Sequence, residues 1–121
     1  MCIRDRIWAA WDELAKGVYS GLTQLGIEDV PLVSIDISNE DILSMQQNPT
    51  LWQATAAVDA GLIGQVNMQL LAEKMAGKTV PSTYQLPACL VPAASLSADT
   101  TMANLHDVVP VSYTHLPIWW M

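Results

Sequence analysis

The sequence predicts an α/β fold in which parallel strands alternate with helices. Three short apolar segments, each about as long as a buried strand, are followed by segments whose apolar residues recur at helical spacing. Strands that alternate with helices pair in parallel through right-handed crossovers. Three strands are fewer than a complete doubly wound domain contains, so we expect a partial three-layer αβα parallel sheet.

The first strand–helix unit is expected between Ile7 and Gly26. Ile7–Ala10 is a short apolar run typical of a buried strand. Gly26 is placed to end the following helix in a left-handed conformation. The helix is expected to bury an apolar stripe with spacings of three and four, made of Trp11, Leu14, Val18, Leu22 and Leu25.

The second unit begins with Pro31–Asp36, a strand apolar enough for burial on both faces, as in a parallel sheet. Ser38 can cap the next helix, which we expect over Asn39–Met45. Asp41 lies three residues after Ser38 and favours that helix N-terminus through its negative charge.

The third unit pairs the strand Trp52–Val58 with a long helix that Asp59 caps and that ends near Ala76. Its apolar stripe and its small residues predict a helix lying close to the sheet: Leu62, Ile63, Val66, Leu70, Leu71 and Met75 form the stripe, and Ala60, Gly61 and Gly64 are the small residues. Beyond Pro81 the segment Thr83–Val91 is extended and contains a proline, which suits an edge or crossing segment. Residues 93–107 are expected to form a loop.

Composition limits the classes of function. The chain has 121 residues, of which 51% are hydrophobic and 14% charged, which excludes a disordered chain and allows one domain. The net charge of −7 argues against nucleic acid and anionic membranes as partners. No apolar run is long enough to span a bilayer. Cys89 stands in an apolar run and is expected to be a buried, inert thiol.

The candidate site is the edge of the sheet where the strands end, because open α/β sheets bind ligands there. Asp36 closes the second strand, where its carboxylate can accept hydrogen bonds from two ligand hydroxyls or, alternatively, cap the next helix. Trp11 and Asp12 follow the first strand on the same edge. Trp11 can cover the apolar face of a sugar or pack in the core, and Asp12 can bind ligand or cap its helix.

The sequence gives no support for an enzyme. It contains no nucleophile elbow, dinucleotide-binding glycine motif, P-loop or paired histidines at metal spacing, so we expect no catalysis, no cofactor and no metal. Asp12, Asp36 and Asp59 on one edge could imitate a magnesium or phospho-acceptor site. Such a site would also need a lysine after a later strand, but the third strand ends in Val58.

The two ends differ in character from the rest. Met1–Arg6 reads MCIRDR and Val111–Leu116 reads VSYTHL, and both resemble translated sequencing-adapter read-through. We therefore expect residues 1–6 and 111–121 to be non-native flanks and leave them out of the fold prediction. The native part is then expected to comprise a lobe over residues 7–92 and a C-terminal loop or tail over 93–110 of a longer protein.

Three segments together resemble a known family. IWAAWDELAKGVYSGLTQLG, PLVSIDIS and WQATAAVDAGLIGQVNMQLLAEKMAGKTVP are similar to the C-terminal lobe of ribose-binding-protein-like, type I periplasmic sugar-binding proteins of ABC importers. The resemblance covers about Ile7–Pro92. It implies two α/β lobes that close over a sugar or polyol, a membrane permease as partner, a periplasmic location and a monomeric parent protein.

The resemblance also assigns roles to residues. It implies that Asp36 binds sugar hydroxyls and that Trp11 stands where the family often places an asparagine. Val58 stands where the ribose-binding pattern has a glutamine, so a sugar or polyol other than ribose is expected, with an apolar patch towards Trp11. Thr83–Val91 resembles the last hinge crossing. The alternative is the effector-binding domain of a LacI-type repressor, which has the same fold.

Overall fold

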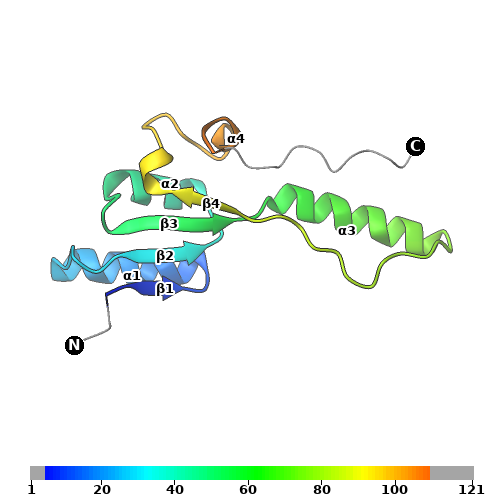
Figure 1. The fold of residues 1–121 in the computed structure, drawn as a ribbon, viewed down its shortest axis with the longest axis horizontal. Helices are drawn as coiled ribbons and strands as arrows, with labels where there is room; N and C mark the ends of the chain where they lie inside the picture. The colour runs from blue at the N-terminus through cyan, green and yellow to red at the C-terminus, as the bar shows by residue number, and fades with distance from the viewer. Residues whose placement is uncertain (1–4, 110–121) are drawn as a thin grey trace.

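The computed structural model describes residues 5–109, so nearly all of the expected non-native ends lie outside the described residues. Figure 1 shows the path of the chain. The elements in chain order are β1 (Ile7–Ala9), α1 (Asp12–Leu25), β2 (Leu32–Ile35), α2 (Asn39–Gln47), β3 (Trp52–Ala57), α3 (Ala60–Met75), β4 (Cys89–Pro92), the 3-10 turn η1 (Ala93–Ser95) and α4 (Leu105–Val108).

The strands form a single sheet in the order β1-β2-β3-β4. β1, β2 and β3 pair in parallel, as the alternation of strands and helices predicts. β4 pairs antiparallel to β3 and forms the edge of the described sheet. Of the extended segment Thr83–Val91, only its last residues therefore join the sheet. The predicted α/β class with a largely parallel sheet is confirmed.

The helices that cover the sheet lie on one of its faces. Strands that follow one another in both sequence and space, joined by right-handed crossovers, place successive helices on the same side. Both α1 and α2 therefore contribute to one core cluster, made of Ala9, Ala15, Leu32, Met45, Trp52 and Ala93. A second cluster on that face joins α2, β3, β4 and α4 and contains Ile42, Ala57, Val91, Leu105 and Val109.

The opposite face of the sheet has no helix over it among the described residues. Along β2, Leu32 and Ser34 are buried whereas Val33 and Ile35 are only half-buried, because successive side chains point to opposite faces. The prediction of burial on both faces of this strand is therefore wrong for residues 5–109. Two of the three expected layers are present, which agrees with a partial αβα sheet.

Helix α1 buries a different face from the predicted one. Gly26 ends it in the left-handed region, as expected, with φ 68°. However, Trp11, Leu14 and Leu25 are exposed, and the inward face is centred on Ala15, with Val18 and Tyr19 packed beside it. Val18 belongs to both faces, so the helix is rotated by roughly 50°, about half of the 100° between successive residues. Tyr19 explains the rotation, because its ring packs on Trp52 at a centroid distance of 6.0 Å.

Helix α3 leaves the sheet instead of lying on it (Figure 1). Asp59 caps it as predicted, accepting hydrogen bonds from the N–H groups of Gly61 (2.8 Å) and Leu62 (3.1 Å). Val66 is its only buried residue. The expectation of close packing on the sheet is wrong: α1, α2 and residues 93–109 cover one face of the sheet, and α3 runs away from the sheet without covering the other face. Gly64 has open space where a Cβ would stand.

Residues 93–109 are more ordered than the predicted loop. They contain η1 and α4, and Leu105 and Val109 are buried against the sheet. Thr100 is also buried, and its hydroxyl accepts a hydrogen bond from the N–H of Ser97 (3.0 Å). Short polar turns replace apolar periodicity in this segment, which is why the sequence pattern does not predict its packing.

Candidate ligand-binding edge

The structure brings Trp11, Asp12 and Asp36 to one edge of the sheet. Trp11 and Asp12 follow β1, and Asp36 is the first residue after β2. Because β1 and β2 are parallel neighbours, their carboxyl ends lie side by side. This part of the prediction is confirmed; ligand contact by these three residues stays a prediction.

Asp36 has an unusual backbone conformation. It is the only non-glycine residue with positive φ among residues 5–109, at 68°. Its N–H still donates to the carbonyl oxygen of Ala56 at 2.8 Å, so the sheet continues to this residue and then turns sharply. Aspartate tolerates the left-handed region better than most residues, and such strain concentrates at functional sites. The side chain of Asp36 is exposed at the turn.

A chain of buried hydrogen bonds holds the backbone of Asp36. The indole Nε1 of Trp52 donates to Ser34 Oγ at 3.0 Å, and Ser34 Oγ donates to Thr55 Oγ1 at 2.9 Å. Thr55 Oγ1 then donates to the carbonyl oxygen of Asp36 at 2.6 Å. Sequence reasoning missed Ser34 and Thr55 altogether. The sequence feature that could have indicated them is a hydroxyl side chain at an inward position of an otherwise apolar strand. A buried polar group there needs a hydrogen-bond partner.

A second set of bonds holds the loop after Asp36. The predicted cap is present as a capping box: Asp41 Oδ2 accepts from the N–H (2.6 Å) and the hydroxyl (2.7 Å) of Ser38. Asp41 is fully buried, and its Oδ1 has no hydrogen-bond partner. The nearest cation is Lys16, whose Nζ lies 3.9 Å from Oδ1. Lys16 reaches across from α1 and also contacts Glu13 (2.7 Å) and Glu40 (3.1 Å).

The pKa values of Asp41 and Lys16 are shifted by burial and by their charged and hydrogen-bonding neighbours. Burial raises the pKa of Asp41 above its ordinary value of 3.8, against the opposing effect of the two Ser38 hydrogen bonds and of Lys16. The negative charge of Asp12 raises that pKa further. Hydrogen bonds from Lys16 to Glu13 and Glu40 raise the pKa of Lys16 above its ordinary 10.5. Lys16 is therefore charged whenever Asp41 titrates.

The structure bears on the alternatives for Trp11, ligand contact or core packing, and for Asp12, ligand contact or helix N-cap. Trp11 is 54% exposed and lies outside the core, so its ring is accessible at the edge. Trp11 occupies the N-cap position of α1, so the alternative that Asp12 is the N-cap is wrong. Asp12 is the first helical residue and is buried; its Oδ1 accepts from the N–H of Glu13 at 2.8 Å. Its carboxylate thus satisfies a free N–H of the first helical turn.

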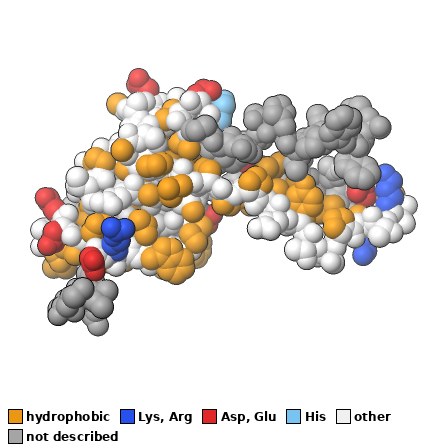
Figure 2. Space-filling view, in the orientation of Figure 1, with side chains coloured by type: hydrophobic (Ala, Val, Ile, Leu, Met, Phe, Trp, Pro, Cys, Tyr) orange, Lys and Arg blue, Asp and Glu red, His pale blue; other side chains and the backbone are white. Residues whose placement is uncertain are grey.

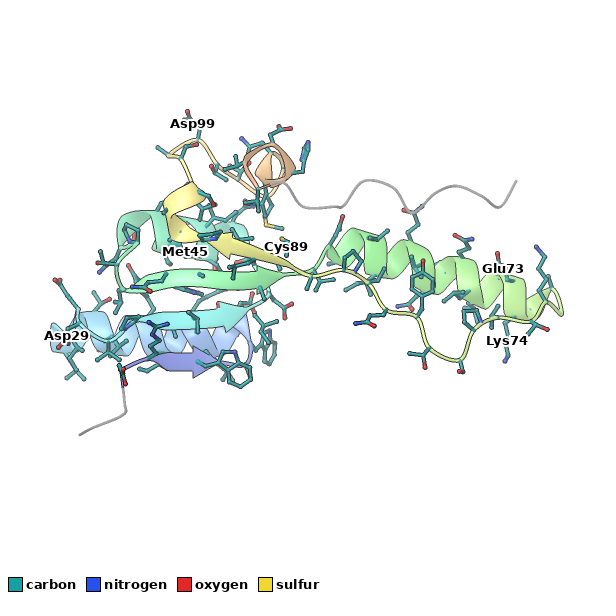
Figure 3. The ribbon with its side chains drawn as sticks, viewed as in Figure 1. Asp29, Met45, Glu73, Lys74, Cys89 and Asp99 are labelled. Atoms are coloured by element: carbon teal, nitrogen blue, oxygen red, sulfur yellow. The ribbon has the colours of Figure 1, made fainter. Side chains whose placement is uncertain are left out.

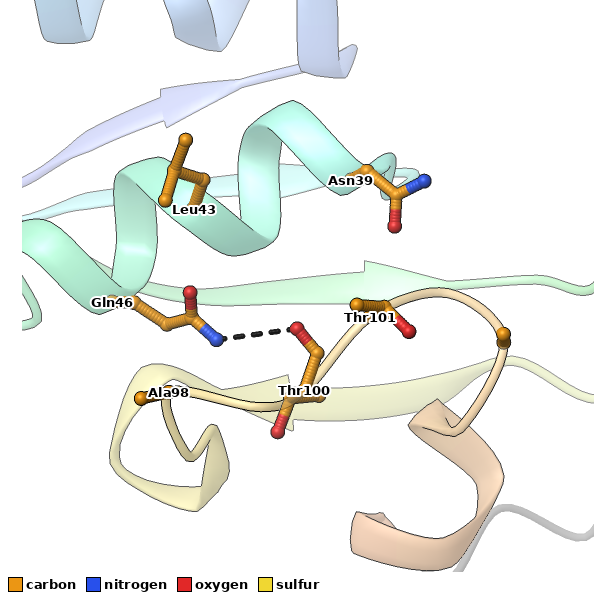
Figure 4. A pocket seen from close by; sticks show the side chains of 7 residues that line it. Asn39, Leu43, Gln46, Ala98, Thr100 and Thr101 are labelled. Carbon is orange, nitrogen blue, oxygen red and sulfur yellow. Dashed lines mark hydrogen bonds between the residues drawn. The ribbon is translucent and has the colours of Figure 1, made fainter.

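A shallow pocket lies elsewhere, between α2 and the segment after η1 (Figure 4). Gln46 crosses it, donating from Nε2 to the carbonyl oxygens of Ser97 and Thr100. None of Trp11, Asp12 and Asp36 lines it, and its volume is about 340 Å³. The pocket is lined by Asn39, Leu43, Gln46, Ala98, Thr100, Thr101 and Ala103.

Three further features of the described residues concern metal binding, acid–base chemistry and membrane insertion. Between residues 5 and 109 no group of three or more histidine, cysteine, aspartate or glutamate side chains could hold a metal ion. His106 and Asp107 form an exposed pair, with Nε2 3.2 Å from Oδ1, on the short α4. No helix in the same part of the chain is long and apolar enough to cross a membrane.

Comparison with solved structures identifies the class of fold. A sugar ABC transporter protein from Yersinia enterocolitica matches with a TM-score of 0.79 and 37% identity, over 88% of this chain and 33% of that one. The 5-methylthioribose transporter solute-binding protein of Thermotoga lettingae, solved with 5-methylthioribose, matches with a TM-score of 0.82 and 28% identity, over 95% and 37% of the two chains.

A third match is an ABC transporter solute-binding protein from Agrobacterium vitis with bound allitol, with a TM-score of 0.69 and 26% identity, over 76% and 32% of the chains. No protein-family model matches the chain, and no curated protein matches it significantly. The predicted resemblance to a lobe of sugar ABC transporter solute-binding proteins is confirmed. The chain spans about a third of the length of these neighbours, which are transport proteins and not enzymes.

Proposed function

We propose that this chain is one lobe of the solute-binding component of an ABC importer for a sugar or polyol. The observation that supports this most is the combination of a 37% identical transport neighbour with an exposed aspartate at the carboxyl edge of the sheet. The role is binding and not catalysis. Ligand would favour closure of this lobe against a second one about a hinge.

In this proposal Asp36 accepts hydrogen bonds from two sugar hydroxyls. Its strained turn projects the carboxylate beyond the end of β2, and the Trp52–Ser34–Thr55 hydrogen bonds keep that turn in place. A carboxylate that is held in position loses little freedom when ligand arrives. Hydrogen bonds to a charged group contribute about 1.5–3 kcal/mol each.

Trp11 supplies the apolar wall. An exposed indole at the same edge can cover the C–H groups of a sugar ring while carboxylates take the hydroxyls. Val58 adds no polar group, so the preferred ligand is expected to carry fewer hydroxyls towards this wall than ribose does, or an apolar substituent there. Asp12 would act more weakly, because its carboxylate is buried and bonded to its own helix.

The partners and location follow from the same proposal. The longer protein would act in the periplasm as a monomer, deliver its ligand to a membrane permease and have no contact with nucleic acid. Thr83–Val91 would form one crossing of the hinge between the two lobes. The chain by itself would bind sugars very weakly, because the second wall of the cleft belongs to the other lobe.

A lobe exchange tests the proposal. Residues 7–109 would replace the matching third of the Yersinia enterocolitica neighbour, and a panel of aldoses, thiosugars and alditols would be titrated by calorimetry. We expect at least one ligand to bind, and the Asp36→Asn variant to bind it at least tenfold more weakly, about 1.4 kcal/mol. Asp36→Asn keeps the shape and the left-handed turn. Asp99→Asn, an exposed carboxylate far along the chain, is the matched control.

Two results would reject the proposal. One is a folded chimera that binds no member of the panel although the parent neighbour does. The other is an Asp36→Asn chimera that binds as tightly as the Asp99→Asn control, which would place the binding site elsewhere.

A further inference from the structure

Lys16 is the only positively charged side chain in the two strand–helix units that form the proposed ligand-binding edge. Between Ile7 and Glu73 the sequence has no other lysine or arginine and no histidine. Figure 2 shows how sparse positive side chains are on one face of the part that holds the sheet. The carboxylates at this edge lie in the first turns of α1 and α2 and at the end of β2: Asp12, Glu13, Asp36, Glu40 and Asp41. A single cation therefore serves a strongly acidic edge.

The two turns that carry the proposed ligand contacts are not joined by the sheet. β1 and β2 pair as far as Ala9 and Ser34, so their register ends before it reaches Trp11 and Asp36. In the described part of the chain no hydrogen bond joins these two turns directly. The separation of Trp11 from Asp36 therefore depends on contacts between the helices that follow them, α1 and α2.

Lys16 makes the polar contacts between these two helices. On α2, its Nζ lies 3.1 Å from Glu40 Oε2 and 3.9 Å from Asp41 Oδ1. On its own helix, the same atom lies 2.7 Å from Glu13 Oε1. Within residues 5–109 no other hydrogen bond or ion pair connects α1 with α2. Lys16 is thus the polar bridge between the two halves of the proposed site.

The contact with Asp41 extends this bridge to the turn of Asp36. Asp41 is fully buried, and its Oδ1 accepts no hydrogen bond. Its other oxygen, Oδ2, accepts from the N–H and the hydroxyl of Ser38, which follows Asp36 closely in the chain. A buried carboxylate that loses its cation is strongly destabilised. The charge of Lys16 therefore stabilises, from α1, the carboxylate that holds the loop after Asp36.

We propose that Lys16 is a positioning residue that holds the turns of Trp11 and Asp36 at a fixed separation and so matches the apolar wall and the carboxylate to one ligand. The inference rests on the proposed function, because this separation matters for binding only if both residues meet the same sugar or polyol. Lys16 acts through α2 and needs no contact with the ligand itself. A fixed separation raises affinity, since less freedom is lost when the ligand binds.

The bridge can be tested on the 121-residue chain without any ligand. In Lys16→Met, the NMR order parameters of the Trp11 and Asp36 amides should fall from the rigid value of about 0.85 towards about 0.6. Lys16→Arg keeps the charge and the reach and should keep both values. Lys74→Met is the matched control, because Lys74 is exposed near the outer end of α3, far from the sheet (Figure 3). Unchanged order at both turns in Lys16→Met would overturn the inference, whether or not the proposed function holds.

The effect on binding can be measured in the chimera described above. Lys16→Met should weaken binding about threefold to tenfold, because only a fraction of the molecules then has the binding-competent separation. Lys16→Arg should restore most of the affinity. A Lys16→Met chimera that binds as tightly as the Lys16→Arg chimera would overturn the inference. A chimera that binds no ligand would reject the proposed function instead, and the order parameters would still decide whether the bridge exists.

A double variant separates positioning from stability. Lys16→Met with Asp41→Asn removes the charges of both partners, so it should recover the thermal stability that Lys16→Met loses. It should not recover the affinity, because the bridge between α1 and α2 is still absent. Recovery of the affinity together with the stability would show that Lys16 only compensates a buried charge, and would overturn the inference.

Discussion

The helix of the arm, the projecting residues 60–88, is more apolar than the helices of the body, the sheet with α1, α2 and residues 93–109, yet only the body builds a core. In the body, Ala15 of α1 and Met45 of α2 are fully buried against Leu32 and Trp52. In the arm, α3 has one buried residue, Val66, and an exposed apolar stripe. The comparison teaches that apolar periodicity predicts that a helix forms, whereas the path of the chain in three dimensions decides what the helix packs against.

The largest effect should come from the centre of the body. Trp52→Ala removes a fully buried ring that packs on Tyr19, and we expect a loss of about 3–5 kcal/mol in the free energy of unfolding. Leu71→Ala in the arm is the comparison, because the exposed side chain should contribute less than about 0.5 kcal/mol in the monomer. Urea unfolding of both variants measures this difference. Equal losses would mean that the arm is as well packed as the body.

A smaller loss should follow from cutting the hydrogen bonds behind Asp36. Ser34→Ala leaves the buried indole N–H of Trp52 without its acceptor, and we expect a loss of about 1–3 kcal/mol. The backbone amide signal of Asp36 should also move in NMR spectra, since Thr55 loses the donor that orients it. Ser44→Ala, at an exposed hydroxyl of α2, is the control. An unchanged Asp36 signal would show that the relay does not position the turn.

A substitution at Gly64 should stabilise helix α3 in the arm, whereas the two preceding substitutions destabilise the body. Nothing lies within 4 Å of a Cβ built at this position, so alanine meets no clash. Glycine costs a helix interior about 0.8–1.0 kcal/mol relative to alanine. Gly64→Ala should therefore increase hydrogen-exchange protection in α3 while leaving the sheet unchanged. A decrease in protection would mean that the arm packs against something at this face.

The smallest expected effect is the pH dependence of stability that the buried carboxylate of Asp41 causes. Because the pKa of Asp41 is raised in the folded state, the folded protein holds this proton more tightly than the unfolded chain does. The contribution of Asp41 to stability is thus fully present below pH 3.8 and decreases as the pH rises through its folded-state pKa. Lys16 stays charged throughout this window, since its own pKa is raised from 10.5.

Asp41→Asn removes this titration and can keep an acceptor for Ser38. The stability of the unaltered chain relative to Asp41→Asn should therefore fall with rising pH in acidic solution, and thermal unfolding at several pH values measures it. Asp99→Asn, at an exposed aspartate, should show no such dependence. A relative stability that rises with pH would mean that Lys16 and Ser38 outweigh the burial of the carboxylate.

Local features of this protein were determined by the sequence alone. Each strand and helix that positions the candidate edge was predicted, together with the caps at Gly26, Ser38 and Asp59 and the location of Asp36 at the end of β2. These depend on side-chain period and on hydrogen bonds within a few residues, which a single sequence displays. The resemblance to transport proteins was equally readable, because it is a pattern of residue types along the chain.

Tertiary structure decided everything that depends on contacts between distant residues. The rotation of α1 follows from Tyr19 meeting Trp52, and the support of Asp36 comes from Ser34 and Thr55, which lie 21 residues apart. Likewise, the departure of α3 from the sheet depends on the direction that the chain takes after β3, which no local pattern of residues reports. Period and propensity report on neighbours along the chain, whereas burial depends on which surfaces the fold has already filled.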